Sequence, residues 1–358
     1  MVTLRDLLEE MTQKGASDLH ITAGVPPEMR VDGLITPTGH EVLTPALTAQ
    51  LAYSVLSDEQ RKTFETTKEL DFSFGVKGLS RFRANVFLQR GVVSLVIRQI
   101  PYAIPPVEGL GLPPAVHEMA RQHKGLFLVT GPTGSGKSTT LASLLDRMND
   151  TRQAHIITIE DPIEYIHHHK KCIVNQREIG ADTGSFPKAL KYVLRQDPDI
   201  ILIGEMRDLE TIEAALTIAE TGHLVLATLH TNSTYEAVNR IVDVFPAEQQ
   251  RQIHTQLAFT LLGVVTQQLV PRSFEAGRTM VAEVLVCTPA IRAVIREGKT
   301  HQIYSLMQAG QKFGMQTMNQ ALLQAVLEKH ISPERAIECT SDRGELESML
   351  DKVVRAAA

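Results

Sequence analysis

The first hundred residues have the hydrophobic pattern of one amphipathic helix followed by short strands. Four apolar residues recur at helical spacing near the start: Leu4, Leu7, Leu8 and Met11. Thr3 and Asp6 have the spacing of a capping box at the start of that helix. Apolar and polar residues then alternate along 81–89, which predicts a strand with 92–100 as its hairpin partner. Residues 1–100 are therefore predicted to form a small α+β domain.

The next segment, residues 101–114, is rich in proline and glycine. It contains Pro101, Pro105, Pro106, Pro113 and Pro114, with Gly109 and Gly111 between them. Proline lacks the backbone N–H that helices and sheets use, so we predict neither helix nor strand here. This segment is interpreted as an interdomain linker.

Beyond the linker, the pattern changes to continuous apolar runs that alternate with helical periodicity. Four runs are predicted to be buried strands, at residues 126–129, 156–159, 200–203 and 224–229, with helices over 141–148 and 211–219. Such alternation is typical of an α/β domain whose mostly parallel sheet is covered on both faces. We assign it to residues 115–358 and expect the part from about 246 to 358 to be mainly helical. In that part, Thr288-Pro289 and Ser332-Pro333 have the form of helix starts.

Composition narrows the class of protein. The chain has 358 residues and a formal net charge of −5, which speaks against a broad basic surface for nucleic acid or an anionic membrane. It has 3 cysteines, none spaced as a CxxC motif, and a reducing cytosolic compartment fits best. No apolar run is long enough to span a bilayer, and the start lacks the pattern of a signal peptide. We therefore expect a cytoplasmic protein without direct membrane insertion.

The segment Gly131–Ser138 has the sequence GPTGSGKS, which matches the phosphate-binding loop G-x-x-x-x-G-K-[ST]. Glycines allow a tight turn whose N–H groups point at phosphate oxygens, and the following helix adds its positive end. Lys137 can reach the β- and γ-phosphates, and the Ser138 hydroxyl can hold Mg²⁺. The expected cofactors are ATP and Mg²⁺. The expected ATP-binding residues are Gly131, Pro132, Thr133, Gly134, Ser135, Gly136, Lys137, Ser138 and Thr139.

Polar residues follow or flank the other predicted strands, and an open α/β sheet binds its ligands at the strands' carboxyl ends. They are Glu160, Asp161 and Glu164 after the second strand, Glu205 and Asp208 after the third, and His223 and His230 around the fourth. Each alone could be a solvated loop residue or a helix cap, and Asp208 fits a cap as well as a catalytic role. Gly204 occupies the place where a magnesium-linked aspartate is usual, and Asp199 is at the other end of its strand. Ser138 is therefore the expected main metal ligand, with Glu205 reaching the ion directly or through water.

Together these motifs resemble the secretion and type IV pilus ATPase superfamily, and within it the pilus retraction ATPases. Thr158–Glu164 resembles its Asp box, Ile200–Asp208 its atypical Walker B segment, and Thr221–Thr231 its His box, with His223 and His230. Further similar segments are Ala16–His20, Arg81–Arg83 and Ala290–Lys299. The resemblance implies a PAS-like N-terminal domain, a RecA-like ATPase domain with a helical C-terminal part, and a homohexameric ring.

The resemblance also implies a function: an ATPase motor that drives retraction of a type IV pilus and twitching motility. Lys137 would hold phosphates, Glu164 would orient or deprotonate the attacking water, Glu205 would support Mg²⁺ and water, and His230 would sense the γ-phosphate. The expected partners are an inner-membrane platform protein of the PilC kind, which would bring the chain to the membrane, and possibly a paralogous retraction ATPase. An accessory paralogue, a RecA-like nucleic-acid translocase and a non-hydrolysing scaffold are the alternatives, and no nucleic acid is expected as a partner.

Three further groups of residues carry hypotheses. Arg81, Arg83 and Arg98 lie on polar strand faces, and one of them could act in trans on a neighbouring subunit's ATP or simply be solvated. The run His167-His168-His169 is interpreted as a solvated edge or loop, because adjacent residues on a strand point to opposite faces. After Thr288, the near-helical spacing of Arg292, Arg296 and Lys299 indicates either a solvated helix face or, as the resemblance implies, a surface needed for retraction but not for hydrolysis.

Overall fold

The computed structural model describes residues 2–31, 33–100 and 103–357. It divides into two compact units, the first of Met1–Ala103 with Glu164–Ile166 and the second of Ile104–Ile163 with His167–Ala358. Within the predicted linker, Pro101 lies outside the described residues, and Val107–Leu110 forms a short 3-10 helix, η1. Helix α4 (Pro114–Ala120) begins at the last proline of that segment, because proline is tolerated in the first turn of a helix.

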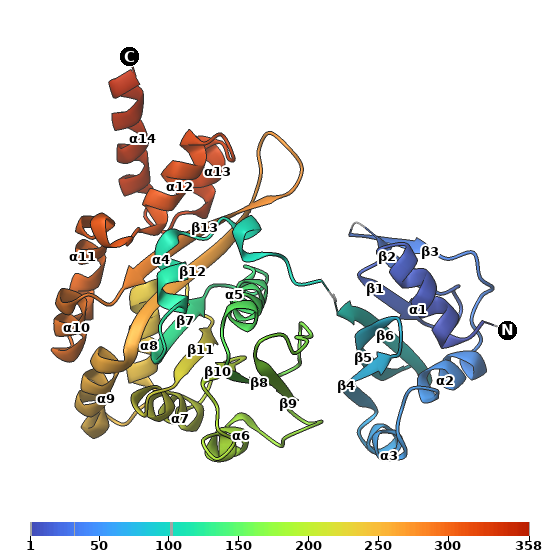
Figure 1. Cartoon of the computed structure of the whole chain (residues 1–358). Coiled ribbons are helices and arrows are strands. Elements are labelled where there is room, and N and C mark those ends of the chain that lie inside the picture. Colours follow the sequence, from blue (N-terminus) through green and yellow to red (C-terminus); the bar gives the residue numbers. More distant parts are fainter. Residues whose placement is uncertain (1, 32, 101–102, 358) are drawn as a thin grey trace. The chain divides into compact units, whose positions relative to one another are not determined.

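The first unit is an antiparallel sheet with helices packed on it (Figure 1). Its strands follow the order β3-β2-β1-β6-β5-β4. The elements are α1 (Leu4–Gln13), β1 (Asp18–Ile21), β2 (Glu28–Val31), β3 (Leu34–Pro37), α2 (Pro45–Tyr53), α3 (Asp58–Thr67), β4 (Glu69–Val76), β5 (Ser80–Gln89) and β6 (Val92–Ile100). The predicted capping box at Thr3 and Asp6 is present, and the predicted hairpin is β5 with β6.

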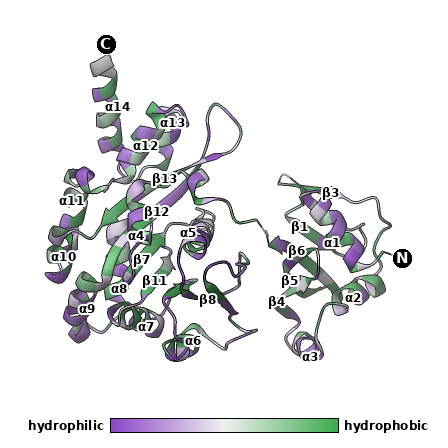
Figure 2. Cartoon of the chain, in the orientation of Figure 1, coloured by the Kyte–Doolittle hydropathy of each residue, from purple (hydrophilic) through white to green (hydrophobic). Residues whose placement is uncertain are grey.

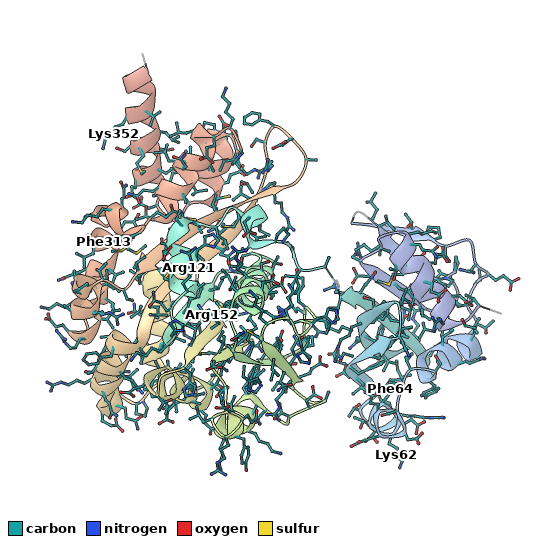
Figure 3. The ribbon with its side chains drawn as sticks, viewed as in Figure 1. Lys62, Phe64, Arg121, Arg152, Phe313 and Lys352 are labelled. Carbon is teal, nitrogen blue, oxygen red and sulfur yellow. The ribbon has the colours of Figure 1, made fainter. Side chains whose placement is uncertain are left out.

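One face of this sheet forms the core of the first unit. Phe82, Ala84 and Val86 of β5 point into it, as their alternation predicts, whereas Leu88 is 37% exposed near the end of the strand. Phe64 of α3 also packs there, edge-on to Tyr53 (Figure 3). Burial of these apolar side chains fixes the register of the sheet, because a shift by one residue would turn them to the solvent.

The second unit is a seven-stranded sheet with helices on both faces (Figure 1). Its elements after α4 are β7 (Gly125–Thr130), α5 (Lys137–Thr151), β8 (His155–Glu160), β9 (Ile173–Glu178), α6 (Phe186–Val193), β10 (Ile200–Ile203), α7 (Leu209–Glu220), β11 (Leu224–Leu229), α8 (Thr234–Asp243), α9 (Ala247–Thr260), β12 (Leu261–Pro271), β13 (Arg278–Val286), α10 (Pro289–Arg296), η2 (Thr300–Gln302), α11 (Ile303–Ala309), η3 (Gln311–Phe313), α12 (Met318–Leu327), α13 (Pro333–Cys339) and α14 (Arg343–Ala357). All four predicted strands and both predicted helices of this region are confirmed.

The strand order is β13-β12-β7-β11-β10-β8-β9, with β12 through β9 parallel and β13 antiparallel at one edge. One hydrophobic cluster packs α4 and α5 on one face, and a second packs α6 to α11 on the other. The inner strands β7 and β11 are mostly hydrophobic in Figure 2 and are buried along their whole length, as strands covered on both faces must be.

The expectation of a mainly helical chain from about residue 246 is wrong for residues 261–286. These residues form the hairpin β12–β13, and β12 pairs with β7, the strand before the phosphate loop. The apolar, β-branched runs at 264–266 and 280–286, on either side of a glycine-containing loop, are the signal of a hairpin. After β13 the chain is helical, and both predicted helix starts, Thr288 and Ser332, are N-caps.

The last helices pack on the outer edge of this sheet through a small hydrophobic cluster of their own, which includes Val270, Val281 and Leu322. The α14 residue Lys352, labelled in Figure 3, is exposed, and Phe313 in the same figure is 50% exposed. The C-terminal helices are therefore joined to the nucleotide-binding sheet mainly through β12 and β13.

Candidate functional site

The phosphate loop connects β7 to α5, at the carboxyl end of the parallel strands. Gly136 is the N-cap of α5 with φ 91°, and Lys137 and Ser138 open the helix. The Lys137 ammonium donates to the backbone carbonyls of Gly131 (2.8 Å) and Pro132 (3.0 Å), so it lies over the loop that it closes. A lysine and a row of backbone amides at a helix N-terminus form a cradle for phosphate groups.

Gly131 is required by its surroundings as well as by its φ of 136°. A Cβ there would lie 2.4 Å from the carbonyl oxygen of Gln267 on β12 and 2.8 Å from the hydroxyl of Ser135. Gln267 is 1% exposed, and its amide donates to the hydroxyl of Thr140 on α5 (2.9 Å). The motif alone did not point to Gln267, because its strand lies about 130 residues further along the chain.

Residues after the neighbouring strands gather at the same edge. Leu229 on β11 is in register with Thr130, and Ile203 on β10 is in register with Ile159 on β8. His230, Glu205 and Glu160 therefore follow their strands toward the phosphate loop. Neighbouring strands lie about 4.8 Å apart. Measured from β7, the strand before the phosphate loop, β11 is therefore the adjacent strand, β10 lies about 10 Å away and β8 lies about 14 Å away.

His223 is not part of this edge. It precedes β11, and Leu224 is in register with Gly125 at the amino end of β7. Its ring contacts the carbonyl of Ile218 and the hydroxyl of Thr221 at the end of α7. The structure thus separates the two histidines of the predicted His box by the length of a strand.

Glu205 and His230 lie together, with 3.4 Å between a Glu205 oxygen and Nε2 of His230. Arg207 contacts both carboxylate oxygens of Glu205, one of them at 2.7 Å. Burial raises the pKa of the Glu205 carboxyl, but the hydrogen bonds from Arg207 and the nearby His230 outweigh it, so that the pKa is lowered overall. Glu205 is therefore held as a carboxylate with an arginine attached, a contact that the sequence motif did not reveal.

A side chain at Gly204 would be crowded by the adjacent strand. A Cβ at this position would lie 3.2 Å from the Glu160 Cα and 3.2 Å from the Ile159 carbonyl oxygen on the adjacent strand. Asp199 accepts a hydrogen bond from the backbone of His155 (2.8 Å), at the amino end of the sheet as expected. Asp208 is the N-cap of α7 and accepts from Thr211 N at 2.9 Å. Of the two roles that its position allowed, the helix cap is the one observed.

The Asp box divides into anchored and exposed members. Glu160 accepts from the hydroxyl of Thr158 (2.6 Å) and the amide of Gln176 (3.2 Å), whereas Asp161 and Glu164 are exposed. No hydrogen bond or ion pair holds the Glu164 side chain within the described part of the chain. A carboxylate left unbound in this way can turn toward a ligand.

The backbone on both sides of Glu164 is fixed. Ile163 N donates to the buried carboxylate of Glu178 (3.2 Å), and His167 N donates to Gln176 (2.8 Å). Asn149 on α5 is fully buried and binds the backbone of residues 168, 170 and 172. Its position on the buried face of α5 is the only sign of this role in the sequence.

The three histidines after this point differ from one another. His168 and His169 are exposed, as expected of a loop, and the His169 ring accepts from Val174 N (3.0 Å). The expectation is wrong for His167, which is 7% exposed and whose pKa burial lowers to about 4. The apolar surroundings therefore keep His167 neutral at physiological pH.

In the first unit, Arg83 on β5 is opposite Arg98 on β6, and Arg98 is opposite Asp18 on β1. Arg98 donates to Asp18 at 2.7 Å, and Arg81 donates to the hydroxyl of Ser73 at 2.8 Å. Arg83 is exposed and has no hydrogen bond or ion pair to the residues described. Among the three candidate arginines, Arg83 is thus the one without a hydrogen bond or ion pair to the residues described, although Arg98 is exposed as well.

Arg292 has a structural role. Its guanidinium donates to the carbonyls of Ala258 and Phe259, the latter at 3.0 Å, near the end of α9. It therefore joins α10 to α9 and is not merely a solvated residue.

Comparison with known proteins identifies the relatives of this chain. The family model described as type II/IV secretion system protein matches residues 2–338. The type IV pilus retraction ATPase PilT of Pseudomonas aeruginosa is 48% identical over 335 residues, which cover 94% of this chain and 97% of that protein. The type IV pilus ATPase PilU of the same organism is 44% identical over 344 residues, 96% of this chain and 90% of that protein.

Among solved structures, the pilus retraction motor PilT with bound ADP matches with a TM-score of 0.92 and 51% identity, over 97% of this chain and 100% of that one. The predicted resemblance and fold class, an N-terminal α+β domain of PAS-like type followed by a RecA-like ATPase domain, are thus confirmed. No helix in the described residues has both the length and the apolar character that crossing a membrane requires.

Proposed function

Because the chain belongs to the type II/IV secretion system protein family, we propose that it is a hexameric ATPase motor that drives retraction of a type IV pilus. The observation that carries the proposal is the phosphate cradle of Gly131–Ser138, with Lys137 lying over its carbonyls. Over almost its whole length the chain is similar to a retraction ATPase, which supports pilus retraction as the function. It is also similar to a structure with bound ADP, which supports nucleotide binding.

The residues of the cradle fit ATP with Mg²⁺. A side chain at position 131 would collide with the Gln267 carbonyl and the Ser135 side chain, so glycine is what permits the tight loop, and the buried Ser135 hydroxyl has no partner in the described residues. Ser138 would hold the ion, which when bound neutralises charge on the phosphates and keeps several waters. We propose that Glu205, two strands away, acts through such a water, and His230 follows the strand between it and the loop.

Glu164 is the proposed residue that orients or deprotonates the attacking water. Its side chain is exposed, while its flanking backbone is anchored through Glu178 and Gln176. We expect Glu164→Gln to nearly abolish turnover while ATP still binds, since the phosphate cradle is unchanged. Hydrolysis and nucleotide affinity are measured together, with Lys137→Ala as the control that loses binding. Near-normal turnover, or a loss of binding like that of the control, would contradict this role.

Hydrolysis is also proposed to need an arginine from the adjacent subunit of the ring, and Arg83 is the choice among Arg81, Arg83 and Arg98. The other two donate to Asp18 or Ser73 in their own unit. An arginine supplied in trans accelerates phosphoryl transfer by about 10³–10⁵-fold. It would also make each site depend on its neighbour, as a ring motor requires.

A mixing experiment tests the role in trans. Arg83→Ala chains keep an intact phosphate loop, and Lys137→Ala chains keep the arginine, so mixed rings should recover activity that neither pure ring has. Arg98→Ala serves as the comparison variant. If mixed hexamers form and no activity returns, Arg83 does not act in trans.

The cargo and partners are tested in cells. We propose that an inner-membrane platform protein of the PilC kind recruits the chain, and that a paralogous retraction ATPase assists it. The chain should restore pilus retraction and twitching to a strain that lacks its own retraction ATPase, and should sediment with membranes only when the platform protein is present. ATPase activity without such rescue would favour an accessory paralogue, and tight, salt-sensitive binding of single-stranded DNA would favour a nucleic-acid translocase.

A further inference from the structure

Glu283 on β13 is a buried carboxylate, 3% exposed, outside the site described above. Its Oε1 accepts from the backbone N of Thr234 (2.7 Å) and from the Thr234 hydroxyl (2.7 Å). Its Oε2 accepts from the backbone N of Met318 (3.3 Å). Burial raises the pKa of this carboxyl, although all of these donors oppose the shift. Burying a carboxylate costs free energy unless hydrogen bonds compensate for the lost hydration, and both oxygens of Glu283 accept such bonds.

The two residues that Glu283 binds are the first residues of two helices. Thr234 begins α8 after the N-cap Ser233, four residues beyond His230. Met318 begins α12 after the N-cap Thr317. One carboxylate therefore holds the first turn of the helix that follows the His230 segment and the first turn of a C-terminal helix.

Glu283 also lies on a polar row that leads to the phosphate loop. It is in register with Thr266 on β12, and the Thr266 hydroxyl is 2.7 Å from that of Thr130, the last residue of β7. Residues in register on adjacent strands point to the same face of a sheet. Thr130, Thr266 and Glu283 thus share one buried face, directly beside the start of the loop at Gly131.

The segment before α12 has little freedom to move away from Glu283. Gln316 and Val284 exchange backbone hydrogen bonds in both directions, at 2.8 and 3.1 Å. The Gln316 amide donates to the carbonyl of Ala282. Helix α12 is therefore tied to β13 by these bonds as well as by Glu283, so a shift of β13 at Glu283 would carry the start of α12 with it.

We infer that Glu283 is a positioning residue that couples the His230 segment to helix α12, so that the state of the nucleotide site reaches the C-terminal helices. The inference rests on the proposed role of His230 beside the γ-phosphate. When ATP becomes ADP, any shift of residues 230–233 changes the position of Thr234 and hence of Glu283. Helices α12 to α14 then respond through Met318.

The test variant is Glu283→Gln, which keeps the size of the side chain but replaces one acceptor oxygen by an amide NH2 group, which donates and cannot accept. We expect kcat for ATP hydrolysis to fall about ten- to a hundredfold, as misplacement of a reacting group does, with the KM for ATP within about twofold. Hydrogen exchange should show that a non-hydrolysable ATP analogue still protects residues 131–139. The change that the analogue induces at 318–322 in the unaltered protein should be lost.

The matched control is Thr317→Val, which removes the N-cap hydroxyl of α12 but leaves every donor to Glu283 in place. It should keep both kcat and the exchange response. If it reproduces the loss of kcat, Glu283 acts only by stabilising α12 and the coupling is refuted. Thr234→Val removes one donor to Glu283 and should lower kcat to a smaller extent, so it replaces Glu283→Gln if that variant does not fold.

His230→Ala separates this inference from the proposed function. If His230→Ala lowers turnover while Glu283→Gln changes neither kcat nor exchange at 318–322, the coupling fails and the role of His230 stands. If His230→Ala leaves turnover unchanged while Glu283→Gln still uncouples α12, the sensor role of His230 fails, and Glu283 couples α12 to the start of α8 instead.

Discussion

Replacing Asn149 by alanine tests how the segment that follows Glu164 is held. Asn149 donates from Nδ2 to the carbonyl of His168 (2.7 Å), and its Oδ1 accepts from the backbone N of Lys170 (3.2 Å) and of Cys172 (3.2 Å). Alanine removes all of these bonds at once. Only the contact to Cys172 is fully buried, so water can replace the partners of the other two groups in part.

The expected cost follows from these contacts. A buried backbone group left unsatisfied costs about 1–3 kcal/mol, and each partly buried hydrogen bond contributes about 0.5–1.5 kcal/mol. The sum is about 2–6 kcal/mol, which corresponds to a fall in melting temperature of about 4–24 °C for a unit of this size. Because the segment carries Glu164 at its start, we also expect lower turnover with little change in nucleotide affinity.

Lys170→Ala is the matched comparison, since Lys170 holds the same segment from the surface. Its ammonium pairs with Asp146 (2.8 Å) and Asp150 (3.0 Å), and both pairs are exposed to solvent. Exposed ion pairs contribute about 0–1 kcal/mol each, so the melting temperature should hardly change. Thermal unfolding of the two variants decides the matter: a fall for Lys170→Ala as large as that for Asn149→Ala would refute the reasoning from burial.

Two further predictions concern the loop and the carboxylate nearest to it. Gly131→Ala should abolish ATP binding, because its Cβ would lie 2.4 Å from the Gln267 carbonyl oxygen. Binding is measured with a fluorescent analogue. The control, Gly134→Ala, has no atom within 4 Å of the added carbon and should bind the analogue more tightly than Gly131→Ala. Glu205 has a lowered pKa in the folded chain, so its contribution to stability is present above its unfolded pKa and is lost as pH falls through the folded value. Glu205→Gln should therefore lower the melting temperature more at pH 7 than in acid, where the carboxylate of the unaltered protein becomes protonated, and an equal loss at both would contradict the ion pair with Arg207.

Local patterns in the sequence determined most of the elements and the location of the phosphate site. The alternation around Phe82, the apolar runs of the parallel strands and the loop at Gly131–Ser138 each depend on neighbouring residues only, through the period of a strand or helix and the freedom of glycine. For the same reason, the sequence alone indicated a helix cap as one role of Asp208. In the structure its side chain accepts a hydrogen bond from the backbone N of Thr211.

What only the tertiary structure decided are contacts between residues far apart in the chain. The sequence could not place β12 beside β7, Gln267 against Gly131 or Glu283 between α8 and α12, because strand order and long-range hydrogen bonds depend on how the whole sheet assembles. In the sequence His223 and His230 belong to one motif. In the structure they lie at opposite ends of the sheet, because the whole of β11 separates them. The spacing of the candidate arginines was uninformative, and the pairing of Arg98 with Asp18, 80 residues away in the chain, is visible only in the folded sheet.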